Sequence, residues 1–464
     1  MENKLKNKID RVIDRDAAAV ILTLAWPTML ESLMDTAVQY VDTAMVGSLG
    51  TAATAAVGCT STVGWLVGSS VSALGIGFLS YIAKALGAKD RESARRAAAQ
   101  AVTVTAVVGL LFTVLTMALA GYVPVWMKAD ESIRKTASVY FTILYAPMLF
   151  RSAKIIFGTL LRAAGDTKTP MRVGIGMNLI NVVLNFFLIY SSRPLWKLGG
   201  RQIYIYGAGL GVVGAALASA ISFVFGGIVI GRALWRHETI SPRGHSYKPD
   251  GEILKPCLKV ALPNMLQRFC TSLGYVVFAS MINSLGELST AAHTVANTVE
   301  SAFYIPGYGM QAAAATLTGN CIGAKDRARL KKLTANIERL EAAMMVVSGG
   351  LLFAFAPQMV SLFSDDPRVI ALGGRVLRMV ALSEPFYGVS VVTEGMLQGA
   401  GITKTPFLFN LLCMWGIRIV GTYICIHVFA LGLISAWGCM IGNNMMLLVL
   451  FRIYWRRRRE RLCG

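Results

Sequence analysis

Long apolar runs alternate with short charged segments along almost the whole chain. A helix needs about 20 mostly apolar residues to cross the hydrocarbon core of a bilayer, and each run provides roughly that length. Hydrophobic residues make up 55% of the sequence and charged residues 15%, whereas soluble domains carry about 25% charged residues. The sequence therefore predicts an all-α polytopic membrane protein. Twelve transmembrane helices are expected over roughly 17–48, 53–83, 97–124, 136–161, 171–192, 206–231, 260–285, 290–322, 342–363, 373–397, 406–428 and 430–451.

The charge and the cysteines exclude other classes of protein. The formal net charge is +20, but nucleic-acid-binding proteins are not this apolar, so no nucleic-acid partner is expected. The 8 Cys residues form no CxxC pair, and the 4 His residues show no metal-ligand spacing. Gly209–Gly214 (GLGVVG) matches a dinucleotide fingerprint, but it opens an apolar run and not a strand–helix unit. We therefore expect no cofactor and no metal beyond a possible Na⁺.

Basic residues gather on one side of the predicted topology. Most of the 45 Lys and Arg residues fall in alternate inter-span segments and at the two ends, and cytoplasmic loops carry such an excess. Both termini are therefore predicted to be cytoplasmic. Residues 1–16 are expected to form a charged surface helix, and 452–464 a basic tail close to anionic lipid. The predicted location is the bacterial inner (plasma) membrane.

The sequence repeats itself at an offset of 236 residues. Leu161–Pro170 (LRAAGDTKTP) matches Leu397–Pro406 (LQGAGITKTP), and GAKD occurs at Gly87–Asp90 and at Gly323–Asp326. Ser48–Gly50 (SLG) recurs at Ser284–Gly286, and Pro27 corresponds to Pro263. Two six-helix bundles related by a pseudo-twofold along the membrane normal are expected, as in transporters built from parallel repeats. The predicted domains are an N-lobe over 17–231, a linker over 232–259 and a C-lobe over 260–451.

Four segments carry a resemblance to a known family. They are VDTAMVGSLG near the end of the first span, GAKD after the second, RAAGDTKTP after the fourth, and ESAFYIPGYGMQAAAATLTG in the eighth. In these segments the chain resembles the multidrug and toxic compound extrusion (MATE) family over essentially its whole length. The resemblance implies a V-shaped pair of six-helix bundles that export organic compounds against an inward flow of H⁺ or Na⁺.

Ionisable residues within membrane spans are functional candidates because burying a charge in the bilayer is costly. Asp35 and Asp42 share one face of the first predicted span, and amides and a hydroxyl follow on the fifth and sixth. A carboxylate near such oxygens can hold a proton or a desolvated Na⁺. The candidate cation-coupling residues are Asp42, Asp35, Asn181, Asn185, Asn178 and Ser219.

The family resemblance supports part of this set. It places Asp42, Asn181, Asn185 and Ser219 on positions of one cation-site arrangement. Asn185 stands where that branch often has a second Asp, and Asp35 stands where an amide is common. The alternatives are interhelical hydrogen bonding by the Asn residues and a buried ion pair at Asp42.

The remaining candidates are assigned to a substrate cavity or to hinges. Glu300 is expected to attract cationic substrate or to couple protons, and a packing pair with Arg268 is its alternative. Arg151 and Lys154 are expected to pair with Glu31 or Asp35, or else to admit anionic or zwitterionic compounds. Prolines bend helices and suit hinges. The cavity set is Glu300, Glu384, Tyr387, Arg151, Lys154, Gln267 and Arg268, and the hinge set is Pro27, Pro147, Pro306 and Pro385.

The leading hypothesis is a secondary active antiporter that works by alternating access between two lobes. It would exchange small organic compounds for H⁺ or Na⁺ within the lipid bilayer, as a monomer. A flippase for lipid-linked sugars is the alternative within the same fold class. A membrane-embedded enzyme is less favoured, because the sequence shows no nucleophile–base or metal constellation.

Overall fold

The computed structural model describes residues 15–198 and 201–462. The surface helix predicted over 1–16 lies outside the described residues except for its last two positions. The N-terminal half contains α2 (Arg15–Gly47), α3 (Thr51–Gly87), α4 (Arg91–Leu119), α5 (Val123–Trp126), α6 (Glu131–Tyr145), α7 (Met148–Ala163), α8 (Lys168–Leu188), β1 (Ser191–Leu198), β2 (Arg201–Ala208) and α9 (Gly211–Arg236).

The C-terminal half is interrupted more often. It contains α10 (Gly251–Asn283), α11 (Glu287–Phe303), α12 (Ile305–Gly323), α13 (Arg327–Ser361), α14 (Pro367–Ala381), α15 (Glu384–Gly399), α16 (Lys404–Leu411), the π-helical η1 (Leu412–Ile419), α17 (Val420–Tyr423), the π-helical η2 (Ile424–Val428) and α18 (Leu433–Arg459).

Within the described residues, 9 helices are long and apolar enough to cross a membrane, or 10 if the bent pair α6–α7 is one span. The runs predicted over 290–322 and 373–397 each form two shorter helices, α11–α12 and α14–α15. Large apolar side chains face outward along the spans. Val114 of α4, for example, is 67% exposed, as expected where lipid and not water covers the surface. The polytopic helical membrane fold is confirmed.

Prolines mark the interruptions. α6 and α7 meet at an angle of 49°, and Pro147 immediately precedes α7. Pro306 and Pro385 occupy the first turns of α12 and α15, where a missing backbone N–H costs nothing. Pro27 lies inside the continuous helix α2. Three of the four predicted hinge prolines thus stand at breaks between helices.

The repeated GAKD motif forms the same turn in both halves. Lys89 and Lys325 adopt left-handed backbone conformations, with φ of 62° and 55°. The Asp that follows each Lys caps the next helix: Asp90 and Asp326 each accept a hydrogen bond from a backbone N–H three residues on. A capping carboxylate satisfies one of the free N–H groups of a helix start. The motif therefore reverses the chain between α3 and α4, and again between α12 and α13.

Two further repeated motifs also keep their backbone conformation. Gly50 and Gly286 have φ of 107° and 95°, and Gly165 and Gly401 have φ of 87° and 74°. Side chains rarely tolerate these values, which accounts for glycine at each position. The repeat seen in the sequence is therefore a repeat of local structure.

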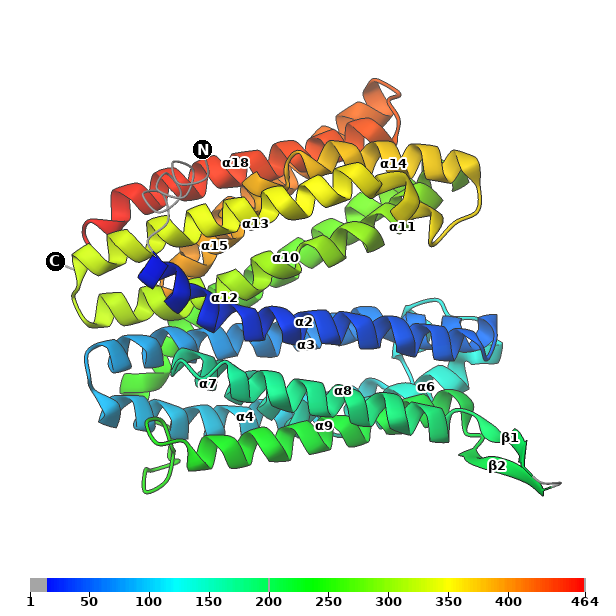
Figure 1. Ribbon diagram of the computed structural model, residues 1–464, viewed down its shortest axis with the longest axis horizontal. Coiled ribbons are helices and arrows are strands. Elements are labelled where there is room, and N and C mark those ends of the chain that lie inside the picture. Colours follow the sequence, from blue (N-terminus) through cyan, green and yellow to red (C-terminus); the bar gives the residue numbers. More distant parts are fainter. Residues whose placement is uncertain (1–14, 199–200, 463–464) are drawn as a thin grey trace.

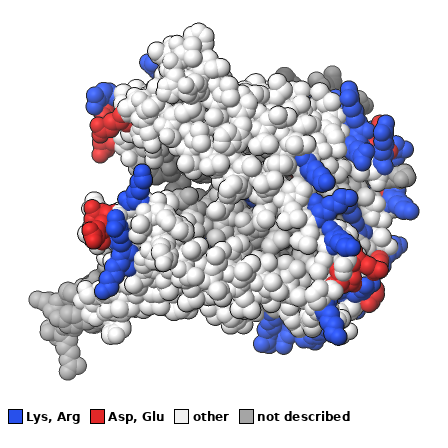
Figure 2. Space-filling model, turned by 180° about the vertical axis from the view of Figure 1, so that it is seen from behind, with Lys and Arg blue, Asp and Glu red and all other residues white. Residues whose placement is uncertain are grey.

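The helices form two groups (Figure 1). Helices α2–α9 lie in one group and α10–α18 in the other, and α3 and α2 meet α10 and α12 between them. Figure 2 shows Lys and Arg side chains gathered at the end opposite the β1–β2 hairpin, with a broad uncharged belt between the two ends. The surface is hollowed between the two groups at the hairpin end. We call the two ends the hairpin end and the basic end.

Two connections differ from the sequence-based expectation. The antiparallel hairpin of β1 and β2 stands where the sequence predicts the end of one span at 192, a loop, and the start of the next span at 206. The segment between α9 and α10 spans 237–250, within the predicted linker of 232–259. It lies along α4: Arg96 Nη2 is 2.6 Å from Asp250 Oδ2, and Gln100 Nε2 donates to the Lys248 carbonyl oxygen at 2.8 Å.

Candidate functional site

A polar cluster lies where α8 packs against α2 and α9. Residues 178, 181 and 185 are spaced three and four apart, so their side chains share one face of α8. Asn185 Nδ2 donates to Asp42 Oδ1 at 2.5 Å. Asn181 lies beside Ser219 of α9, with 3.1 Å between its side-chain nitrogen and Ser219 Oγ. The structure thus brings together the four residues that the family resemblance singled out.

Asp42 sits in a niche rich in oxygen atoms. With the Asn181 amide turned so that its nitrogen faces the carboxylate, this nitrogen donates to Asp42 Oδ1 at 2.9 Å and its oxygen accepts from Ser219 Oγ. In the opposite orientation the amide oxygen faces Asp42, which requires a proton or a cation between the two acceptors. Asn185 Oδ1 is buried and has no hydrogen-bond partner among the described residues. The niche therefore offers ligands for either H⁺ or Na⁺.

A second polar network extends from this niche toward the basic end. Asn178 Nδ2 donates to Asp35 Oδ1 at 2.7 Å. Lys154 Nζ lies 3.1 Å from Glu31 Oε1 and 3.8 Å from Asp35 Oδ2, so the predicted pairing of Lys154 with these acids is present. Arg162 Nη2 lies 2.5 Å from Glu31 Oε2. Sequence reasoning missed Arg162, because it placed this residue in a charged segment outside the membrane.

Arg151 has a different environment from the one expected. Its guanidinium lies over the rings of Phe223 and Tyr145, at 4.9 Å and 5.6 Å from their centroids. The expected ion pair with Glu31 or Asp35 is absent from the ion pairs of the described residues, where Lys154 and Arg162 pair with Glu31 instead. A cation stacked on aromatic faces is stabilised by the quadrupole of the rings.

The candidates of the C-terminal half fall into two places. Glu300 is buried and accepts a hydrogen bond from Tyr304, whose ring lies 4.4 Å from that of Tyr387. The alternative pairing of Glu300 with Arg268 is not the one observed, because Arg268 Nε donates to Asn264 Oδ1 at 3.1 Å. Elsewhere, Gln267 Nε2 donates to Glu394 Oε1 at 2.9 Å.

Sequence reasoning also missed Glu341. The predicted span began at 342, but α13 already begins at Arg327, so residue 341 lies well inside the helix. Glu341 and Glu384 are both fully buried, at 0% exposure. Its carboxyl lies against Gly307 of α12 and Gly388 of α15, a contact between helices that no local sequence pattern indicates.

The two halves meet tightly at the basic end. Ser80 Oγ of α3 donates to the Gly399 carbonyl oxygen at 3.0 Å. Thr316, the residue equivalent to Ser80 in the repeat, donates from Oγ1 to the Arg162 carbonyl oxygen at 3.2 Å. Gly87 packs on the Asn320 backbone, and its repeat equivalent Gly323 packs on the Lys84 backbone. The contact between the halves therefore has an approximate twofold symmetry.

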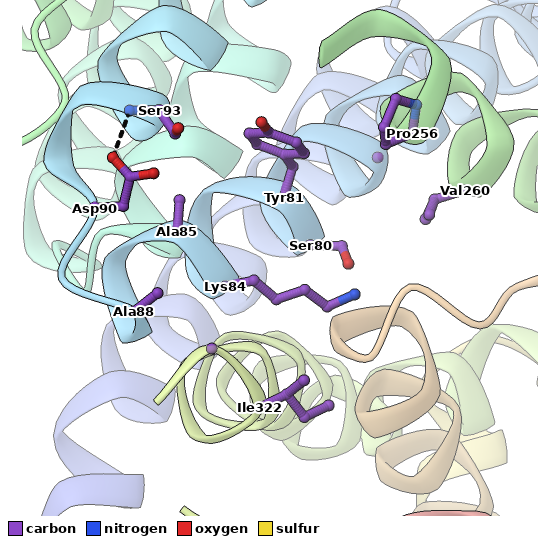
Figure 3. A pocket seen from close by; sticks show the side chains of 12 residues that line it. Ser80, Tyr81, Lys84, Ala85, Ala88, Asp90, Ser93, Pro256, Val260 and Ile322 are labelled. Atoms are coloured by element: carbon purple, nitrogen blue, oxygen red, sulfur yellow. Dashed lines mark hydrogen bonds between the residues drawn. The ribbon is translucent and has the colours of Figure 1, made fainter. Parts of the chain in front are cut away.

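A cavity of about 450 Å³ borders this contact. Figure 3 shows the Lys84 side chain extending from α3 across the cavity toward the second half, with Tyr81 and Ser80 on the same helix. Lys84 Nζ donates to the Ala400 carbonyl oxygen at 2.8 Å. The basic end is thus closed by hydrogen bonds and by glycine contacts, whereas the hairpin end is open.

Comparison with known proteins was made by family, by sequence and by structure. The MatE family model matches residues 27–187 and 263–424, and these two matches begin at the repeat-related prolines. A "Probable multidrug resistance protein NorM" of Thermotoga maritima is 26% identical over 94% of this chain and 93% of its own length. The "Probable multidrug resistance protein YoeA" of Bacillus subtilis is 24% identical over 93% of each chain.

Solved structures share the fold. A MATE structure in a bent conformation has a TM-score of 0.87 at 24% identity, covering 96% of both chains. A MATE in complex with MaL6 has a TM-score of 0.87 at 25% identity, again covering 96% of both chains. An outward-facing multidrug resistance MATE family transporter of the MOP superfamily has a TM-score of 0.86 at 24% identity, also covering 96% of both chains.

Proposed function

The chain belongs to the MatE family, and on that premise we propose that it is a secondary active antiporter that exports drugs or other organic compounds. The counter-ion is H⁺ or Na⁺ moving inward. The observation that carries this proposal is the niche at Asp42, where one carboxylate, two amides and a hydroxyl from three helices converge. The names of the relatives in Thermotoga maritima and Bacillus subtilis support organic compounds as the cargo.

The proposed membrane arrangement has twelve spans. The pairs α6–α7, α11–α12 and α14–α15 each complete one span, and the two groups of helices are an N-lobe and a C-lobe. The basic end faces the cytoplasm, in keeping with the positive-inside rule, so both termini are cytoplasmic. The protein is proposed to lie in the bacterial inner membrane as a monomer.

The proposed cycle is alternating access. A cation enters through the opening at the hairpin end and binds at Asp42, which is only partly buried. Binding neutralises the carboxylate and changes its hydrogen bonds to Asn185 and Asn181, so that α2 repacks against α8 and α9. The cargo is released outward, the basic end then opens, and the cation leaves to the cytoplasm. A cation can shift this equilibrium only if it binds the two states with different affinity.

The experiment that tests the function is transport in sealed vesicles. Purified protein is reconstituted, and efflux of ethidium, a fluorescent organic cation, is followed under a pH gradient alone, a Na⁺ gradient alone, and neither. We expect ethidium transport under at least one of the two gradients, and no transport when neither gradient is present. Equal transport in all three conditions would overturn coupled antiport.

The same vesicles distinguish the two counter-ions. A proton-coupled carrier moves ethidium under the pH gradient alone, whereas a sodium-coupled carrier requires the Na⁺ gradient. Protein-free vesicles carrying the same gradients are the control for leakage of the dye. Transport by vesicles containing the Asp42→Asn variant would show that the niche is not the coupling site even if antiport itself is correct.

A further inference from the structure

Glu341 of α13 is buried in a niche made by glycines of two other helices. A Cβ atom at Gly388 of α15 would lie 2.6 Å from Glu341 Oε1, and one at Gly307 of α12 would lie 3.2 Å from the same atom. The carboxyl therefore occupies the space that side chains at 307 and 388 would fill. Neither oxygen of Glu341 has a hydrogen-bond partner among the described residues.

Glu384 is placed reciprocally across the same contact. A Cβ atom at Gly349 of α13 would lie 3.2 Å from Glu384 Cβ and 2.6 Å from the Ala381 carbonyl oxygen. Both Glu384 oxygens also lack a hydrogen-bond partner within the described part of the chain. Since Glu384 and Gly388 are one helical turn apart, about 6 Å along α15, the two carboxyls border one stretch of the α13–α15 contact.

Within the described residues, no Lys or Arg side chain donates a hydrogen bond to Glu341 or Glu384. The titratable groups facing the pair are Glu300 of α11, Tyr304 at the break before α12, and Tyr387 of α15. Among the bases of this half, Arg418 of η1 lies with its guanidinium 4.1 Å from the Phe278 ring centroid, and Arg268 of α10 is engaged with Asn264. A buried carboxylate without a cation or hydrogen-bond donors costs several kcal/mol, so neutral carboxyls are strongly favoured here.

The atoms around Glu341 favour binding of a proton over binding of a metal cation. Sodium and other hard cations require several oxygen ligands, whereas the other side-chain atoms close to Gly388 and Gly307 here are the apolar Met345 Cγ and Val391 Cγ1. This contrasts with the niche at Asp42, where amide and hydroxyl oxygens stand beside the carboxylate. One proton on each glutamate neutralises it without further ligands.

We propose that Glu341 and Glu384 form a proton-binding pair in the C-terminal half, separate from the site at Asp42. In the state described here each glutamate carries one proton as a neutral carboxylic acid. When the α13–α15 contact opens to water, a proton passes from the carboxyl to water and leaves a solvated carboxylate. The use of this pair in coupling rests on the proposed antiport, but the presence of its protons does not.

The direct test is infrared spectroscopy of the purified full-length protein in lipid at neutral pH. Protonated carboxyl groups give a C=O stretching band that shifts on exchange from H₂O to D₂O. We expect Glu341→Gln and Glu384→Gln each to remove part of this band. Loss in the folded Glu384→Gln variant alone supports the pair if Glu341→Gln does not fold. An undiminished band in every folded variant overturns the proposal.

A matched control lies on the same helix. Glu338 of α13 is three residues before Glu341, and Arg452 Nη2 lies 3.4 Å from its Oε2, so it is expected to be ionised. Glu338→Gln should leave the band unchanged, and an equal loss in this variant would overturn the assignment of the band to the pair.

A second measurement separates this inference from the transport function. Proton release on addition of ethidium to the wild-type protein is measured in weakly buffered detergent solution. If the wild type releases no proton but the infrared band is lost in the variants, the proton pair stands and proton-coupled antiport fails. If Glu341→Gln releases fewer protons per protein than the wild type, the pair takes part in coupling.

Discussion

Asn185 donates its side-chain amide to Asp42 across the contact between α8 and α2, with 2.5 Å between Nδ2 and Oδ1. The same carboxylate faces the side chain of Asn181, which in turn contacts Ser219 of α9. Asp42 is thus linked to α8 directly, and to α9 through Asn181 and Ser219. In the proposed cycle, a proton or Na⁺ that binds this carboxylate would first change these side-chain contacts.

The first prediction concerns the charge of Asp42. In Asp42→Asn the side chain keeps its size but can no longer bind or release a proton, and it is a weaker ligand for Na⁺. Ethidium efflux from cells or vesicles is expected to fall to background while the amount of protein in the membrane stays unchanged. Asp16→Asn, at the exposed start of the same helix, is the control and should keep near-normal efflux. Full efflux in Asp42→Asn would rule out this role.

The second prediction concerns the closed basic end. Gly87 and Gly323 touch the backbone of the opposite half, so an added methyl group overpacks the contact, which typically costs 1–3 kcal/mol. In Gly87→Ala and Gly323→Ala we expect the equilibrium to move about tenfold or more toward a state open at this end, because about 1.4 kcal/mol corresponds to a factor of ten. Labelling of a cysteine introduced at Ser80 with a water-soluble maleimide measures the opening.

The control for this prediction is Gly58→Ala. Gly58 lies on the same helix α3, and a Cβ atom there would have no neighbour within 4 Å. The Gly58→Ala variant should be labelled at position 80 to the same extent as the protein in which all three glycines are kept. Equal labelling in all three alanine variants would contradict the assignment of the two glycines to closure.

The third prediction concerns the stability of the N-terminal half. Glu31 is 3% exposed and pairs with both Lys154 and Arg162. Glu31→Gln leaves two partly buried cations without their counter-charge, and breaking such a pair from one side costs about 3–5 kcal/mol. A clear fall in the temperature of thermal unfolding is expected. The double variant Glu31→Gln with Lys154→Met should recover part of the loss, and no recovery would contradict the pairing.

The fourth prediction concerns the connection between the halves. The hydrogen bond from Arg96 lowers the pKa of Asp250 below its ordinary value of 3.8. A lowered pKa in the folded protein means that the contact contributes stability above about pH 4 and loses it as the pH falls further. At neutral pH, Asp250→Asn should weaken the contact and speed tryptic cleavage after Arg243, which is followed by Gly244. Wild-type protein at neutral pH is the reference, and an unchanged cleavage rate would show that the bond does not hold the segment.

Much of the fold followed from local sequence patterns. The apolar runs predicted the long helices, because a lipid-facing helix must be apolar over its full length. The repeated motifs contained glycines that only special backbone conformations require, such as Gly165 and Gly401. The hairpin of β1 and β2 was missed because its residues do not alternate strongly, although the dipeptide Gly199-Gly200 between the two segments is a typical hairpin-turn sequence.

For the candidate site, some residues could be predicted from the sequence and others could not. The Asn residues of α8 could be found because their spacing places them on one helix face, and the family resemblance placed Asp42 beside them as part of one cation site. Arg162 and Glu341 could not, because each lies where a charged segment merges into a span and only the three-dimensional packing shows which way the side chain goes. Arg151 was expected beside an acid, but the rings of Phe223 and Tyr145 lie within its reach and Glu31 already has two partners.

The contact at the basic end has the character of an isologous interface. In a homodimer with twofold symmetry, residue i of one subunit meets residue j of the other, and j meets i. Here Gly87 contacts Asn320 and Gly323 contacts Lys84, but both sides of the contact belong to one chain. In a homodimer the two sides of such a contact must carry the same residues, whereas within one chain they can differ. One position accordingly holds Lys84 and its repeat counterpart holds Asn320.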